Sequence, residues 1–188
     1  FENLNSGGEK LSPQELRNGI YPCAFNRAMK KINEENEIWR KLWGTINDKC
    51  KDLEMLYRLS ALKTYVVYAK KEYKIEAYGN STTALIDKFA EKSFSFHDEK
   101  IVEYVNSLEQ FISRLNISRT YFLKTALIEG LYIVFEKRQM RCEITDGICE
   151  AISSKNFFRD STAGGTTGMA NMNKRWKGIY GVLSKYDQ

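Results

Sequence analysis

The sequence predicts an all-α fold, a multi-helix bundle of about 7–9 helices. Apolar residues recur at steps of three and four along most of the chain, which is the helical period. Only two of the 188 residues are proline, against about 5% in average proteins, and this disfavours a turn-rich β-sandwich. Hydrophobic residues make up 43% and charged residues 28%, a composition typical of folded domains rather than disordered chains.

The first predicted helix begins at Ser12. The Ser12 side chain can cap backbone amides, Pro13 suits the first helical position, and Glu15 can complete a capping box. The helix should end before Pro22, because the residue that precedes a proline is pushed out of the helical region.

The central part of the chain predicts further helices and one ambiguous segment. Helical periodicity covers residues 25–32, 38–43 and about 51–70. Residues 64–68 are rich in β-branched and aromatic side chains, so this end of the long helix could instead form a strand. After a loop, another helix should continue through Ala90.

The second half contains the clearest helical patterns. Residues 97–116 carry one continuous apolar stripe. Residues 119–137 are apolar around most of the helix, which predicts a position at the centre of the bundle. A short helix is expected over 144–153 and a loop over 154–170, followed by a final helix from 171 to about 186.

Composition excludes several kinds of site. The single histidine rules out centres that need two or more histidines from this chain, and no catalytic residue or metal ligand can be nominated. The four cysteines form no C-x-x-C pair, so free thiols are expected.

No stretch approaches eighteen apolar residues, so no membrane partner is expected and a cytoplasmic protein is favoured. The net charge of +5 is compatible with a polyanionic partner.

A glycine-rich segment precedes the last predicted helix. Gly164, Gly165 and Gly168 suggest a phosphate-binding loop, but Met169 stands where such a loop needs a lysine. A simple connection is therefore favoured. The alternative that amides before Asn171 hold a phosphate at a helix N-terminus stays open.

The C-terminal region is basic. Arg159 precedes the last helix, and Lys174, Arg175 and Lys177 are expected on its exposed side, opposite its apolar face. These four residues are candidates for contacts with nucleic-acid phosphates. The alternative is a solvated helix face with no ligand.

The N-terminal segment has the properties of a binding loop. Asn5 offers both a donor and an acceptor, and Gly7 and Gly8 allow backbone amides to approach a ligand closely. The positive end of the helix that begins at Ser12 points back toward this loop. A purely structural loop is the alternative.

Residues 1–18 read F-x-x-x-N-x-x-G-x-x-L followed by S-x-Q-E-x-R-N. This run resembles the second signature of the ParB/sulfiredoxin-like N-terminal domain family of GmrSD-type, modification-dependent restriction endonucleases. The anchor positions of that signature fall on Phe1, Asn5, Gly8 and Leu11. Relatives often have arginine at position 3, where this chain has Asn3.

The resemblance implies a division of the chain. Residues 1–22 would be the end of a ParB-like nucleotide-binding domain, an N-terminal loop left from a truncated α+β domain, and residues 23–188 a helical bundle subdomain. The residues that the resemblance assigns to nucleotide binding are Asn3, Asn5, Gly7, Gly8 and Arg17.

The resemblance also implies an activity for the whole protein. Members hydrolyse nucleoside triphosphate (NTP) with an upstream D-G-Q-Q-R motif, which this sequence lacks, and a His-Asn-His nuclease domain or subunit cuts modified DNA. We therefore expect a fragment of a nucleotide-dependent restriction or phage-defence protein that is not catalytic alone. The expected partners are DNA and a nuclease, with NTP and Mg only in the full-length protein. The alternative is a non-catalytic helical module that binds nucleic acid or a protein through the basic last helix.

Overall fold

The computed structural model describes residues 10–76 and 78–187, and the all-α prediction is confirmed. The described residues form eleven helices and two small two-stranded sheets. The helices, in chain order, are α1 (Pro13–Ile20), α2 (Ala24–Glu35), α3 (Glu37–Trp43), α4 (Lys51–Tyr65), α5 (Thr82–Ser93), α6 (Asp98–Ser113), α7 (Arg119–Phe122), α8 (Thr125–Arg138), α9 (Asp146–Ser153), α10 (Asn156–Thr162) and α11 (Met169–Leu183).

Two differences account for the helices beyond the expected 7–9. The helix expected over 119–137 is interrupted at residues 123–124 and becomes α7 and α8. A further helix, α10, forms inside the segment expected to be a loop. Phe158 is buried there and the ring of Phe157 packs against Gly178 of α11, so tertiary contacts stabilise a helix that lacks a strong sequence pattern.

The sequence left residues 64–68 open between helix and strand, and the structure divides them: Thr64 and Tyr65 end α4, and Val66 begins the first strand of a β-hairpin. Strand β1 (Val66–Ala69) pairs antiparallel with β2 (Glu72–Ile75). The two residues of the turn, Lys70 and Lys71, have φ values of 52° and 62°. Two left-handed residues in succession match the twist of the flanking strands, so they close a tight hairpin.

A second, parallel pair of strands joins distant parts of the chain. Strand β3 (Leu115–Asn116) pairs with β4 (Ile144–Thr145). This pairing ends α6 earlier than the sequence predicts and fixes the start of α9, whose N-cap is Thr145.

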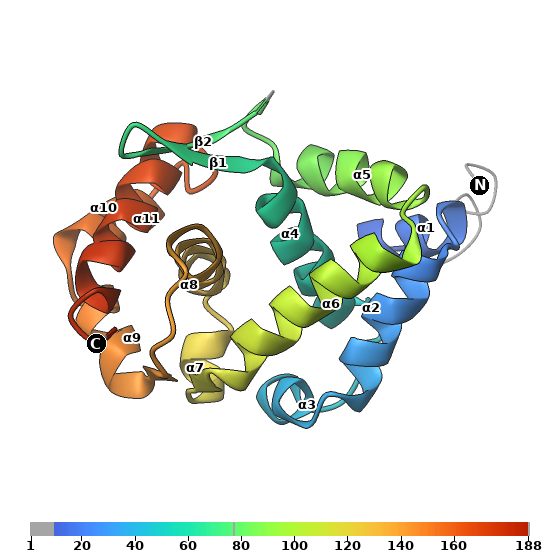
Figure 1. The fold of residues 1–188 in the computed structure, drawn as a ribbon, viewed down its shortest axis with the longest axis horizontal. Helices are drawn as coiled ribbons and strands as arrows, with labels where there is room; N and C mark the ends of the chain where they lie inside the picture. Colours follow the sequence, from blue (N-terminus) through green and yellow to red (C-terminus); the bar gives the residue numbers. More distant parts are fainter. Residues whose placement is uncertain (1–9, 77, 188) are drawn as a thin grey trace.

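Helix α8 lies at the centre of the bundle, as its all-round apolar character predicts (Figure 1). All residues from 127 to 134 are buried. A Cβ atom at Gly130 would lie only 2.3 Å from Cδ1 of Ile179, so the absent side chain permits the close approach of α11.

The remaining elements gather at the two ends of the molecule (Figure 1). Helices α1, α2 and α5 lie at one end, where Phe25 makes edge-to-face contacts with four aromatic rings: Tyr57, Phe89, Phe96 and Tyr104. Helices α9, α10 and α11 and the hairpin lie at the other end. Helices α4 and α8 lie between the ends, so Arg17 of α1 is far from the C-terminal candidate residues.

Two further sequence expectations can be compared with the structure. All four cysteines are free thiols, as expected. Burial raises the pKa of Cys149 to about 12. No helix within residues 10–76 and 78–187 has the length and apolar character needed to cross a membrane.

Candidate functional site

The helix that follows the N-terminal motif begins as predicted. The Ser12 hydroxyl accepts the backbone N–H of Glu15 at 3.2 Å, and the Glu15 carboxylate accepts the backbone N–H of Ser12 at 2.6 Å. The bond to that N–H is the main cause that lowers the pKa of Glu15. The Ser12 hydroxyl also donates to the carbonyl of Lys49, which ties the start of α1 to the segment before α4. The capping box is confirmed.

Only one residue assigned to nucleotide binding falls within the described part of the chain, and it is Arg17. The other four lie outside it: Asn3, Asn5, Gly7 and Gly8.

Arg17 is 3% exposed, and its guanidinium is held by side chains from three helices. It donates to Asp87 of α5 at 2.7 Å, to Glu54 of α4 at 3.1 Å and to Gln14 of α1 at 3.2 Å. Its Nη2 atom is buried without a hydrogen-bond partner among the described residues. Arg17 and Asp87 also line a hollow of about 310 Å³ beside α1, which we call the Arg17 hollow. The guanidinium is therefore fixed in position with one polar group left unpaired.

Charged side chains continue from Arg17 toward the centre of the molecule. Glu54 also accepts from Arg58 at 3.3 Å, and Arg58 donates to Glu129 of α8 at 3.0 Å. Burial by itself would lower the pKa of Arg58, but the carboxylates of Glu129 and Glu54 raise it above its ordinary value. Glu129 is only 5% exposed. Alternating charges thus connect α1, α4 and α8.

A neutral network supports α1 on its other side. Gln14 and Asn26 both donate to the side-chain oxygen of Asn18, at 3.1 and 2.9 Å. Asn26 also donates to the hydroxyl of Tyr57 at 2.9 Å. Gln14 and Asn26 are buried, so these bonds satisfy polar groups that burial would otherwise leave unpaired.

Three of the four residues predicted to contact nucleic acid are exposed, and each already has a partner. Lys174 forms an ion pair with Asp160 at 3.0 Å, and Lys177 forms one with Glu72 of the hairpin. Arg159 donates to the side chain of Asn156 at 2.6 Å. Exposed pairs of this kind are weak and can be exchanged for a ligand.

The prediction that Arg175 lies on the exposed side of the last helix is wrong. Arg175 is 1% exposed and donates to the backbone carbonyls of Ser161 at 3.1 Å and Thr166 at 3.2 Å. It faces α10 and the glycine-rich segment, because α10 forms where the sequence predicted a loop. Burial lowers the pKa of Arg175, and the negative charge of Glu129 opposes that effect.

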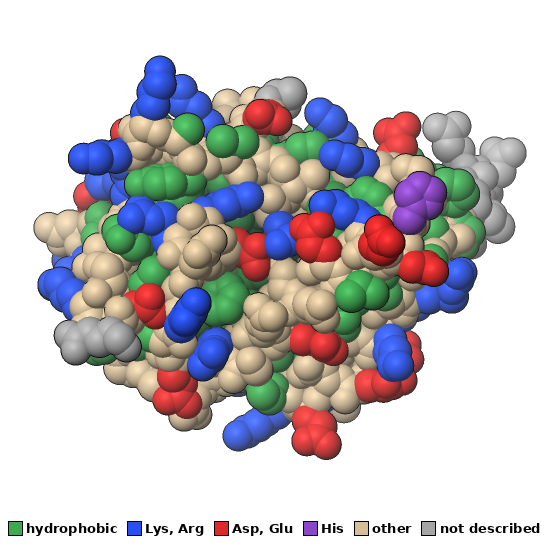
Figure 2. Space-filling model, in the orientation of Figure 1, with side chains coloured by type: hydrophobic (Ala, Val, Ile, Leu, Met, Phe, Trp, Pro, Cys, Tyr) green, Lys and Arg blue, Asp and Glu red, His purple; other side chains and the backbone are tan. Residues whose placement is uncertain are grey.

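A surface that combines basic and aromatic side chains lies where the hairpin meets α8 and α11. It encloses a hollow of about 310 Å³, and we call it the basic–aromatic surface; its residues are Tyr68, Lys71, Tyr73, Arg138, Lys177 and Tyr180. The guanidinium carbon of Arg138 lies 3.5 Å from the ring centre of Tyr180 and 4.6 Å from that of Tyr68. Arg138 also donates to the Tyr68 hydroxyl at 2.7 Å. Figure 2 shows Lys and Arg side chains gathered toward the hairpin end of this face.

Among the residues of the basic–aromatic surface, the sequence nominated only Lys177 as a binding residue. The usable signal was the separation of two runs that contain aromatic and β-branched residues by only Lys70 and Lys71, which is the spacing of a hairpin, although Lys-Lys is not a typical pair for such a turn. Nothing in the sequence places Arg138 and Tyr180 beside that hairpin, because their contact depends on how α8 and α11 pack.

The remaining sequence candidates carry no chemistry that can be identified. His97 is exposed at the N-cap of α6, and the described residues contain no group of three or more side chains that could hold a metal ion. In the glycine-rich segment, Asn171 donates to the carbonyls of Gly164 and Gly165. These two bonds, together with the bond from Arg175 to the carbonyl of Thr166, hold the glycine-rich segment by its backbone carbonyl groups.

Comparison with known proteins gives no match to a family model, to a curated protein or to a solved structure.

Proposed function

We propose that this chain is the helical part of a nucleotide-dependent DNA-processing protein of the restriction or phage-defence type that acts in the cytoplasm. It contributes part of a nucleotide site and a DNA-contacting surface, while the catalytic groups come from other parts of the protein or from a nuclease partner. The motif in residues 1–18 supplies the family hypothesis. The structural observation that carries the proposal is the buried guanidinium of Arg17, which follows the motif, lines a hollow and has an Nη2 amino group without a hydrogen-bond partner among the described residues.

An arginine in this setting is well suited to a phosphate group. A guanidinium binds phosphate through directed, charge-assisted hydrogen bonds. Because Asp87 and Glu54 already fix the side chain of Arg17, little further conformational entropy is lost when a ligand binds.

The two carboxylates beside Arg17 also repel an anion, so the phosphate charge must be balanced. Mg²⁺ does this in nucleotide complexes, where it needs only one or two protein carboxylates in addition to the phosphates. Asp87 presents an exposed carboxylate at the Arg17 hollow. In this proposal Asp87 would contribute one carboxylate to the metal ion of a bound NTP, and the remaining ligands would come from the phosphates and water.

Nucleotide binding tests the proposal. In the natural full-length protein, Arg17→Lys keeps the charge but loses the planar fork, so we expect the Kd for a fluorescent NTP analogue to rise about tenfold. Arg27→Lys changes an exposed arginine of α2 and should leave the Kd unchanged. Asn5→Ala provides a second variant in case Arg17→Lys unfolds the protein. Wild-type affinity in both Arg17→Lys and Asn5→Ala would contradict the proposal.

A second candidate function is supported by the basic–aromatic surface: a non-catalytic module that binds nucleic acid. Positive charge attracts the phosphate backbone, and aromatic rings beside it offer stacking surfaces for bases. Lys71 at the hairpin turn, Arg138 and Lys177 provide the charge on this surface.

Fluorescence anisotropy with labelled single-stranded and duplex DNA tests this second function. Lys71→Gln combined with Lys177→Gln should weaken binding several-fold and lower the slope of log K against log salt by about one per lost phosphate contact. The matched control, Lys31→Gln with Lys41→Gln, removes the same charge from α2 and α3. An equal loss in the control would show only a net-charge effect. Arg175 is left intact because its burial would confound the result.

A further inference from the structure

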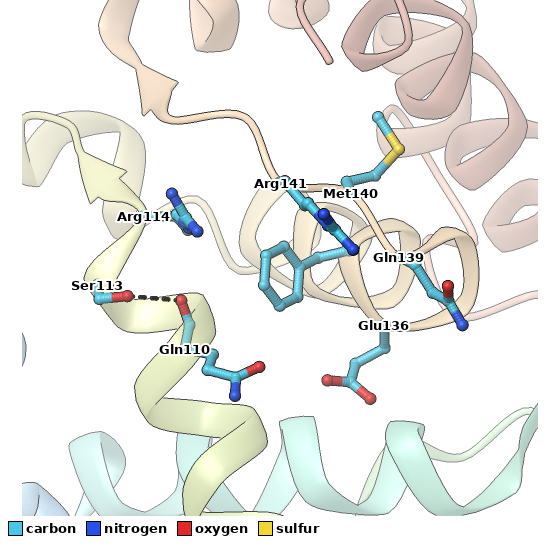
Figure 3. A pocket seen from close by; sticks show the side chains of 8 residues that line it. Gln110, Ser113, Arg114, Glu136, Gln139, Met140 and Arg141 are labelled. Carbon is cyan, nitrogen blue, oxygen red and sulfur yellow. Dashed lines mark hydrogen bonds between the residues drawn. The ribbon is translucent and has the colours of Figure 1, made fainter. Parts of the chain in front are cut away.

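A hollow of about 510 Å³ lies where α6 and α8 end (Figure 3). Gln110 and Arg114 line it from the end of α6, and Glu136, Gln139 and Arg141 line it from the end of α8 and just beyond. Figure 3 shows Arg114 on the α6 side and Arg141 over the end of α8. We call it the two-arginine hollow.

The acidic side chain of the two-arginine hollow is already paired. The carboxylate of Glu136 accepts from the Lys63 ammonium at 2.5 Å and from the Ser107 hydroxyl at 2.5 Å. The lysine balances the negative charge of Glu136. The charges that remain are therefore the two guanidinium groups.

Neither guanidinium has an ion pair or a side-chain hydrogen bond among the described residues, although both arginines line the hollow. The nearby carboxylate of Asp187 accepts the backbone N–H groups of Arg141 and Cys142 instead. Arg114 is the C-cap of α6, and a cation there is favoured by the carbonyl end of the helix. Arg141 lies outside any helix, so capping does not explain the second arginine.

We propose that the two-arginine hollow binds a phosphate group through Arg114 and Arg141. Two guanidinium forks offer paired N–H groups that match phosphate oxygens. The side-chain amides of Gln110 and Gln139 add neutral donors that can complete the hydrogen bonds. The carbonyl ends of α6 and α8 oppose an anion, so the arginines rather than backbone amides must hold it.

This phosphate group can belong to a free nucleotide or to a nucleic-acid backbone. The nucleic-acid source would connect the hollow with the basic–aromatic surface, since Arg138 of that surface is close to Arg141 in the chain. The proposal uses neither Arg17 nor Lys177, so its failure can be distinguished from the failure of either proposed function.

Calorimetric titration with pyrophosphate at low salt tests the site. The wild-type chain should bind pyrophosphate, and Arg114→Gln with Arg141→Gln should raise the Kd by about tenfold or more. The control, Arg27→Gln with Lys41→Gln, removes equal charge from exposed positions of α2 and α3 and should change the Kd less than about twofold. Absence of binding to the wild type, or equal losses in the two double variants, would overturn the proposal.

Competition identifies the source of the phosphate. Displacement of pyrophosphate by an NTP supports a nucleotide ligand, and displacement by a short oligonucleotide supports a backbone phosphate. Citrate serves as an anion without phosphate. If citrate displaces pyrophosphate with the same potency as the phosphate compounds do, the assignment to phosphate is overturned. The Arg17→Lys variant should bind pyrophosphate like the wild type at this site, which separates the test from that of the proposed function.

Discussion

Arg17 and Arg175 show how the partners of a buried guanidinium decide what it can do. Both are almost fully buried. Arg17 forms ion pairs with two carboxylates, Glu54 and Asp87, and its Nη2 amino group has no hydrogen-bond partner among the described residues. The bonds of Arg175 go to two backbone carbonyls in and near the segment between α10 and α11, and its Nε atom is also buried without a partner among the described residues. Because the partners of Arg17 are carboxylates and those of Arg175 are backbone carbonyls, we propose a binding role for Arg17 and a role in the stability of the C-terminal end for Arg175.

Arg175→Gln should lower the free energy of unfolding by about 2–4 kcal/mol, because it removes buried charge-assisted bonds and leaves two carbonyls without donors. Lys174→Gln, the neighbouring exposed position, should change it by less than about 0.5 kcal/mol. Urea unfolding followed by circular dichroism measures both values. Equal stability of the two variants would contradict the buried position of Arg175.

The error about Arg175 has a general cause at the scale of single residues. Helical periodicity identifies the apolar face of a helix from Met172, Trp176 and Ile179, and it assigns polar residues to the opposite face. It cannot show that a second element covers that face. Here α10 and the glycine-rich segment cover part of it, so one arginine is buried while Lys174 and Lys177 stay exposed.

Elements with strong local signals could be predicted from the sequence. The helix after Ser12 has a capping box, and α8 is apolar all round, so local chemistry determines both. Only the first strand of the hairpin was foreseen, as an alternative to helix over residues 64–68, because aromatic and β-branched residues are compatible with both structures. Helix α10 was missed because packing against α11 stabilises it. The basic–aromatic surface was missed for the same reason, since it joins elements far apart in the chain.

Packing between α10 and α11 gives a test at the scale of elements. A Cβ atom at Gly178 would lie 2.3 Å from Cδ2 of Phe157, whereas at Gly181 nothing lies within 4 Å. Gly178→Ala should therefore destabilise the protein by about 1–3 kcal/mol. Gly181→Ala, in the same helix, should stabilise it by about 0.5–1 kcal/mol because alanine favours the helix. Thermal unfolding compares them, and destabilisation by both substitutions would contradict the packing.

At the scale of the whole molecule, the candidate sites lie at opposite ends of one helical bundle (Figure 1). The Arg17 hollow lies beside α1, and the basic–aromatic surface lies at the hairpin and α11. Glu54, Arg58 and Glu129 extend a series of ion pairs from Arg17 through α4 into α8 at the centre of the bundle. The bundle therefore holds a nucleotide-binding candidate and a DNA-binding candidate on one packed core.

The central claim, a nucleotide-dependent DNA-processing protein, is tested most directly by NTP hydrolysis in the natural full-length protein with and without DNA. We predict that the wild type hydrolyses NTP and that Arg17→Lys and Asn5→Ala each lower the rate about tenfold or more. Arg27→Lys should retain the wild-type rate, and the melting temperatures of all variants should be measured alongside. A wild-type protein that neither binds nor hydrolyses any NTP, or full activity in both motif variants, would contradict the account.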